Sequence, residues 1–388
     1  MKTHPCLRTV LCALSIVGLA ACGGGGGGGG GETSGNGTLR LAMTDAPSCG
    51  YSAVNVTVEK VRVHQSSSAS DSDAGWSEVV LNPARRVDLL TLTNGVLMEL
   101  GQVPLPAGKY TQLRLVLASN TGAQPLANSV LPTGASEVAL KTPSGQQSGV
   151  KTNVNIDVGA NQMADFVLDF DACKSVVAAG ASGQYLLKPV VSVISRFVSG
   201  VQGYVELGTG TSVSLQFNGE LVRATTPDSA GKFLLQPVAP GSYTLVVVGA
   251  GRTTTVVTGV PVAAETVTSV STGAAPLSLP PSPVATVQGT APVDTMVRVL
   301  QPLSVGGTIE VAGRGVDGVT GAYGFMVPTL APRVAPYAAP GTGLVFAADS
   351  AATGRYAVQA RLGGFADKTQ ALPVLTEGAV QTMDFTFP

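Results

Sequence analysis

Charged side chains are scarce in this chain. Asp, Glu, Lys and Arg make up only 12% of its 388 residues, and the formal net charge is −1. A typical soluble domain carries about twice that share of charge. No basic stretch offers a field that would attract nucleic acid or anionic lipid headgroups. We therefore expect no nucleic acid partner.

Histidine is almost absent, with two residues in the whole sequence. A metal site built from several histidines is therefore excluded, and His64 is the one candidate base for a Ser-His-Asp or Cys-His arrangement. His64 closes the run Lys60-Val-Arg-Val-His64 on its polar side, so we interpret it as a solvated residue at a strand end. There is also no Gly-x-Ser-x-Gly elbow. The sequence predicts neither an enzyme nor a cofactor.

Long apolar runs are missing too, since none reaches the roughly eighteen residues that a transmembrane helix needs. The one notable run is short, Val10 to Leu19, and follows the basic residues Lys2 and Arg8. With the small pair Ala20-Ala21 after it, this pattern predicts a signal peptide over residues 1–21. Nine glycines, 23–31, open a flexible Gly-rich tether over residues 22–37.

The motif Leu19-Ala20-Ala21-Cys22 resembles the lipobox of bacterial lipoproteins. That resemblance implies cleavage before Cys22 and acylation (palmitate among the chains) of the cysteine, which anchors the protein to a membrane. The residue after the cysteine is Gly23 rather than the Asp that favours inner-membrane retention in Gram-negative cells. We therefore expect an outer-membrane lipoprotein that faces the periplasm or the cell surface.

Cysteine is also sparse. Of five cysteines, Cys22, Cys49 and Cys173 remain after the predicted cleavage. Because Cys22 carries lipid, we predict a Cys49–Cys173 disulfide in the oxidising envelope. Two buried free thiols are the alternative.

Alternating apolar residues predict that the rest of the chain is all-β, as a tandem of β-sandwich-like domains. Val54, Val56 and Val58 share one face, and the parity then changes to Val61 and Val63. The change predicts a bulge or a strand break near Glu59-Lys60. Asn94-Gly95 predicts a turn.

Several motifs in a fixed order resemble domain of unknown function family 4382, which occurs in bacterial envelope lipoproteins. The resemblance implies an envelope location and a β-rich fold over residues 38–197, and it implies no activity. The motifs include Leu41-Ala-Met-Thr-Asp-Ala-Pro47, Gly75-Trp76, Asp88-Leu-Leu-Thr-Leu-Thr-Asn-Gly95, Leu105-Pro-Ala-Gly-Lys-Tyr110, Asp169-Phe-Asp171 and Leu187-Lys-Pro189.

Two further units follow. Asp228-Ser-Ala-Gly-Lys-Phe233 and Pro240-Gly-Ser-Tyr243 resemble elements of carboxypeptidase regulatory and transthyretin-like β-sandwiches, a carbohydrate-binding-like fold. We expect this sandwich at residues 198–272, a Pro-rich linker at 273–284, and a second sandwich repeat at 285–388. Within the repeat, about residues 328–350 read as a long, exposed Ala/Pro-rich loop.

Four groups of residues are candidates for chemistry, and for each we favour a structural interpretation. Asp71, Asp73 and Glu78 are spaced like half of a calcium loop but lack its remaining ligands. Asp165, Asp169 and Asp171 could act as paired carboxylates, yet the last two share the outward face of one strand. Trp76 could stack on a sugar, and residues 143–149 lack a lysine to bind phosphate.

We therefore expect a cell-envelope protein with a non-enzymatic binding or structural role. It would contact the membrane through the acyl chains on Cys22, and an envelope protein or a glycan as ligand. A carbohydrate-binding protein is the alternative. A glycan hydrolase with an unrecognised carboxylate pair is a further alternative.

Overall fold

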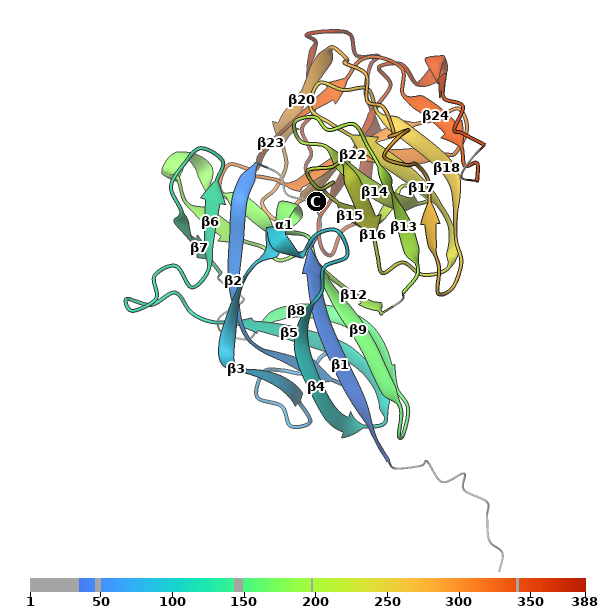
Figure 1. Cartoon of the computed structure of the whole chain (residues 1–388). Coiled ribbons are helices and arrows are strands. Elements are labelled where there is room, and N and C mark those ends of the chain that lie inside the picture. Colours follow the sequence, from blue (N-terminus) through green and yellow to red (C-terminus); the bar gives the residue numbers. More distant parts are fainter. Residues whose placement is uncertain (1–34, 46–49, 143–148, 197, 340–341) are drawn as a thin grey trace, which may run out of the picture. The chain divides into compact units, whose positions relative to one another are not determined.

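Strands dominate the computed structural model (Figure 1). It describes residues 35–45, 50–142, 149–196, 198–339 and 342–388. Helical structure in these ranges is limited to α1 (Ala172–Ser175) and three 3-10 turns, η1 (Leu89–Leu92), η2 (Gly180–Ser182) and η3 (Ser350–Ala352). The predicted all-β class, as a series of sandwich-like sheets, is confirmed.

The first segment, residues 35–196, contains two sheets around one hydrophobic core. In the first sheet the strand order is β12-β9-β1-β4, with β1 parallel to β9 and antiparallel to β4. In the second it is β10-β11-β7-β6-β2-β5-β8, and β3 pairs with β2. The strands are β1 (Asn36–Asp45), β2 (Tyr51–His64), β3 (Ser77–Asp88), β4 (Met98–Pro106), β5 (Gly108–Leu117), β6 (Ser129–Pro132), β7 (Val138–Lys141), β8 (Val150–Val158), β9 (Met163–Phe170), β10 (Val176–Ala178), β11 (Tyr185–Leu187) and β12 (Val191–Ser195).

Strand β2 follows the predicted alternation closely. Val54, Val56 and Val58 are buried, and burial then moves to Val61 and Val63. The register shifts between Val58 and Lys60 in the pairings with both β3 and β5. An extra residue at this point returns the valines to the core face, as the bulge prediction requires.

The second segment, residues 198–283, forms another sheet pair around its own core. One sheet has the order β16-β13-β19, and the other begins β15-β14-β17-β18. The strands are β13 (Gly200–Tyr204), β14 (Ser212–Phe217), β15 (Glu220–Thr225), β16 (Lys232–Leu235), β17 (Gly241–Val248), β18 (Thr255–Val262) and β19 (Val267–Ser269).

The third segment, residues 284–388, repeats this plan with the orders β23-β20-β28 and β22-β21-β26-β27 around a third core. In both segments the opening strand pairs with a later strand in parallel, β13 with β19 and β20 with β28. The strands are β20 (Val284–Thr290), β21 (Met296–Pro302), β22 (Thr308–Gly315), β23 (Ala322–Pro328), β24 (Arg333–Pro336), β25 (Ala347–Ala348), β26 (Ala357–Arg361), β27 (Lys368–Ala371) and β28 (Val380–Thr382).

The stretch predicted as a stiff linker, residues 273–284, packs instead against the second segment. Leu277 forms a bridge with Val205, and Leu277 and Leu279 are buried in the second core. The backbone N–H of Leu277 donates to the Tyr204 carbonyl at 2.8 Å. Apolar residues between the prolines explain the difference, because burying them is more favourable than leaving them in solvent.

The stretch predicted as an exposed loop, about residues 328–350, also contains paired structure. β24 runs parallel to β18 and pairs antiparallel with β25, so both strands extend the sheet of the second segment. Ala335 is fully buried there. The third segment therefore covers what would otherwise be the free edge of β18.

Three Gly-x-Tyr motifs end at Tyr110, Tyr243 and Tyr356, and their tyrosines make the same kind of contact. Tyr110 and Tyr243 are buried, and each hydroxyl donates at 2.9 Å to the carbonyl of the residue four positions earlier, Pro106 and Ala239. Tyr356 is buried as well and donates to the carbonyl of Pro328 at 2.7 Å. These bonds resemble the tyrosine corner of β-sandwiches, in which a buried hydroxyl fixes the entry to a strand.

Candidate functional site

The residues considered as calcium ligands contact other groups of the protein. Asp71 forms ion pairs with Arg62 and, at 3.5 Å, with Arg114. Asp73 accepts from the backbone N–H of Ser70 at 2.9 Å. No group of three or more His, Cys, Asp or Glu residues that could hold a metal occurs in the described ranges.

Glu78 is engaged in the same way. It pairs with Lys60 at 3.0 Å and with Arg62 at 2.8 Å. Asp71 and Glu78 thus pair with neighbouring cations, and Asp73 accepts a hydrogen bond within the loop.

His64 ends β2 and Trp76 directly precedes β3, so the two residues lie at the two ends of the loop that contains Asp71 and Asp73. The guanidinium of Arg62 lies 4.6 Å from the Trp76 ring centre and that of Arg114 lies 4.9 Å from it. Both arginines are within the range of cation–π contacts with this ring. His64 accepts from the Ser66 N–H at 2.9 Å, and its Nε2 lies 3.0 Å from the Ala74 carbonyl, so backbone groups occupy both ring nitrogens.

The three aspartates of β9 and its end pair with different cations. Asp165 pairs with Arg40, Asp169 with Arg223, and Asp171 with Lys174 at 3.5 Å. Asp171 also caps α1 by accepting from the Lys174 N–H at 2.9 Å. Each of the three carboxylates is thus engaged by a different cation.

Charged residues gather instead where the three segments meet. Lys174 of α1 pairs with Glu310 of β22 at 3.3 Å, and Arg298 of β21 pairs with Glu310 at 2.5 Å. Arg298 also reaches Glu220 at the start of β15, at 3.0 Å. Lys174, Arg298 and Glu310 keep only 13%, 4% and 8% of their side-chain surface exposed. We call these residues, together with Asp171, Glu220 and Arg361, the junction network.

The junction network shifts several pKa values. Burial raises the pKa of Asp171 despite the nearby Lys174 ammonium. Burial acts to lower the pKa of Lys174, but the charges of Glu310 and Asp171 outweigh it and raise the pKa. Hydrogen bonds from Arg361, at 2.5 and 2.8 Å, lower the pKa of Glu220 to about 2.

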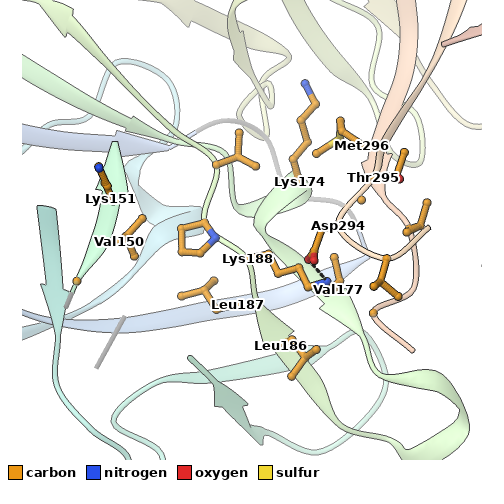
Figure 2. A pocket seen from close by; sticks show the side chains of 17 residues that line it. Val150, Lys151, Lys174, Val177, Leu186, Leu187, Lys188, Asp294, Thr295 and Met296 are labelled. Carbon is orange, nitrogen blue, oxygen red and sulfur yellow. Dashed lines mark ion pairs between the residues drawn. The ribbon is translucent and has the colours of Figure 1, made fainter. Parts of the chain in front are cut away.

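A cavity of about 770 Å³ lies beside this network, between residues 149–190 and 293–318 (Figure 2). Val150, Val177 and Leu187 are among its apolar walls. Figure 2 shows Lys188 and Asp294 meeting across it, and their side chains pair at 2.5 Å. The cavity therefore combines apolar walls with an ion pair that joins two segments.

The predicted modification sites fall largely outside the described residues. Cys22 and Cys49 lie outside the described residues. So do residues 143–148, from the stretch considered for phosphate binding. Cys173, in α1, is disulfide-bonded, and its pairing with Cys49 stays a prediction. No helix within the described part of the chain is long and apolar enough to span a membrane.

Comparison with known proteins identifies the first segment. Residues 36–189 match the family described as Domain of unknown function (DUF4382). The family prediction for this stretch is confirmed. The DUF4382 match covers the first segment only, and no curated protein matches the chain.

Solved structures are similar only at low scores. A type II cohesin–X-dockerin complex from Acetivibrio cellulolyticus is 25% identical over 21% of this chain and 58% of its own, with a TM-score of 0.19. The pilus adhesin SpaC from Lactobacillus rhamnosus GG is 9% identical over 91% of this chain and 44% of its own, with a TM-score of 0.14. A streptococcal ancillary pilin is 10% identical over 89% and 98%, also at 0.14. This chain thus spans little more than half of the cohesin–dockerin chain, and scores this low carry no argument about function.

Proposed function

We propose that this chain is a non-enzymatic component of the cell envelope, with a binding or structural role. In this proposal Cys22 carries acyl chains that hold the protein at the outer membrane, and the three β-rich segments extend from it. Each buried acyl CH₂ contributes about 0.8 kcal/mol, so two or three chains give stable attachment.

The observation that supports the proposal is a set of buried ion pairs between segments. In a chain with so few charged residues, Arg223, Arg298 and Lys174 are nearly buried and each pairs with a carboxylate of another segment. Asp169, one of the carboxylates considered for catalysis, belongs to these contacts, and Asp171 pairs with Lys174 within the first segment. Because these charged side chains join segments to one another, they favour a structural scaffold over an enzyme.

Envelope fractionation tests the anchoring half of the proposal. The wild-type chain should sediment with outer membranes, and Cys22→Ser should release it or leave it unprocessed. Protease treatment of intact and permeabilised cells then separates a surface position from a periplasmic one. A wild-type protein recovered in the cytosolic fraction would contradict the envelope assignment.

A further inference from the structure

A second cavity, of about 890 Å³, borders all three segments. Its walls come from α1 and β10, from β14 and β15, and from β22 and β23. The volume is within the range of ligand sites in proteins, about 300–1,000 Å³. We call this cavity the edge groove.

The residues along the edge groove show which side of each strand faces it. From β14 only every second residue lines it, Ser212, Ser214 and Gln216, so β14 presents one face. From β23 five consecutive residues line it, 322–326. Because side chains alternate between the two faces of a strand, consecutive lining means that the backbone edge of β23 borders the groove.

The edge of β23 is free to pair. β23 is the outermost strand of its sheet and, within the described ranges, pairs with β20 alone. The neighbouring edge of β22 is already covered at Glu310, whose backbone N–H and carbonyl each bond the Gln216 amide at 2.8 Å. Unpaired backbone groups along a strand are a template for another strand.

Space for a further backbone is present at Gly324. A Cβ placed on Gly324 would meet no heavy atom within 4 Å, and its φ lies outside the left-handed region. A glycine inside a strand that needs neither a turn nor a close internal contact often marks the approach of another backbone. The next residue but one, Met326, is 71% exposed and supplies an apolar rim.

The walls of the edge groove carry one arginine that a ligand could pair with. Arg314 is exposed, lies 5.5 Å from the Phe325 ring centre, and has no ion pair among the described residues. The other charged groups on the walls are occupied: Lys174 pairs with Asp171 and Glu310, and Asp317 accepts three backbone N–H bonds. An unpaired guanidinium favours a carboxylate.

We propose that the edge groove binds an extended acidic peptide segment of a partner protein, which adds to β23 as a further strand and sets a carboxylate against Arg314. The inference rests on the proposed non-enzymatic binding role and names its partner class. Backbone hydrogen bonds would supply affinity, and Arg314 would select acidic side chains.

Fluorescence anisotropy with the purified full-length chain tests this. The probes are labelled peptides of seven residues, the length of β23, with alternating Val and Thr and a Glu, Gln or Lys at one varied position. We expect saturable binding of the Glu peptide, weaker binding of the others, and none when alternate backbone nitrogens are methylated. Arg314→Gln should weaken the Glu peptide about tenfold, and Gly324→Leu should abolish binding by filling the groove.

Matched variants control for general effects. Arg355→Gln removes another exposed arginine, and Gly363→Leu adds the same side chain at another glycine with open space around it. Both should bind like wild type, and thermal unfolding should confirm that all variants fold.

Three outcomes would overturn the inference: no saturable peptide binding, binding indifferent to Arg314 and Gly324, or binding of trigalacturonic acid in place of peptides. None of these would bear on anchoring through Cys22, which fractionation tests separately.

Discussion

Arg223 of β15 forms an ion pair with Asp169 of β9, and its second terminal nitrogen donates to the Thr44 hydroxyl at 2.7 Å. Only 2% of the Arg223 side chain and 11% of the Asp169 side chain remain exposed. One buried guanidinium thus joins the second segment to two strands of the first. Removing it would leave the Asp169 carboxylate buried without this ion pair, whereas the Thr44 hydroxyl would still donate to the Leu92 carbonyl at 2.8 Å.

We predict that Arg223→Met lowers the free energy of unfolding by about 3–5 kcal/mol, because a buried carboxylate is left unpaired. Urea denaturation measures this. Arg355→Met, at an exposed arginine, should change stability by no more than about 0.5 kcal/mol. Adding Asp169→Leu to Arg223→Met should restore part of the loss, whereas strictly additive effects would mean that the two residues are not coupled.

Glu220 should make stability depend on acid. Its pKa is lowered from 4.5 to about 2 in the folded chain, so its ion pairs stabilise the fold fully above pH 4.5 and are lost as the pH falls toward 2. Glu220→Gln should reduce stability at neutral pH and flatten the pH profile between 4.5 and 2. Thermal melts across this range measure both effects. The exposed Glu377→Gln serves as the control, and identical profiles for the Glu220 variant and wild type would refute the prediction.

The Cys49–Cys173 disulfide would close a loop of more than a hundred residues. In the chain-entropy model it contributes roughly 4–5 kcal/mol, which reduction should remove. Thiol labelling of unfolded, unreduced protein should find neither cysteine reactive. Two labelled thiols would instead support the alternative of free cysteines.

Calcium should leave the thermal unfolding temperature unchanged, since Asp71 and Glu78 already pair with arginine and lysine. Asp71→Asn should destabilise the chain by no more than about 1 kcal/mol, because 51% of the Asp71 side chain is exposed. Ser72→Ala, in the same loop, is the control. A stabilisation by calcium that Asp71→Asn abolishes would restore the metal hypothesis.

Local features of the fold were predictable because they depend on neighbouring residues. The valines of β2 predict both the strand and its bulge. Asn94-Gly95 predicts a turn, and both of its residues have positive φ. The family motifs of the first segment were predictable for the same reason. Each signal lies within a few residues of what it specifies.

The pairings of the linker and loop stretches were not predictable because their partners are distant in the sequence. Nothing near β24 indicates that it will pair with β18, about eighty residues earlier. Proline and alanine in residues 328–350 suggested an exposed loop, yet a strand at a sheet edge tolerates proline.

The junction network was missed for a related reason. Arg298 and Glu310 each occur singly in the sequence, without a motif, and their partners lie in other strands or other segments. A buried charge in so apolar a chain is the signal that could have marked them, since burial of a charge requires a partner.

The central claim is a non-enzymatic role in the envelope, and turnover is its most direct test. The full-length chain would be incubated with peptidoglycan and a panel of acidic and neutral polysaccharides while released reducing ends and peptides are measured. We predict no release above that of heat-denatured protein. Release that depends on the folded chain and disappears on substitution of one of its carboxylates would contradict the account and identify an enzyme.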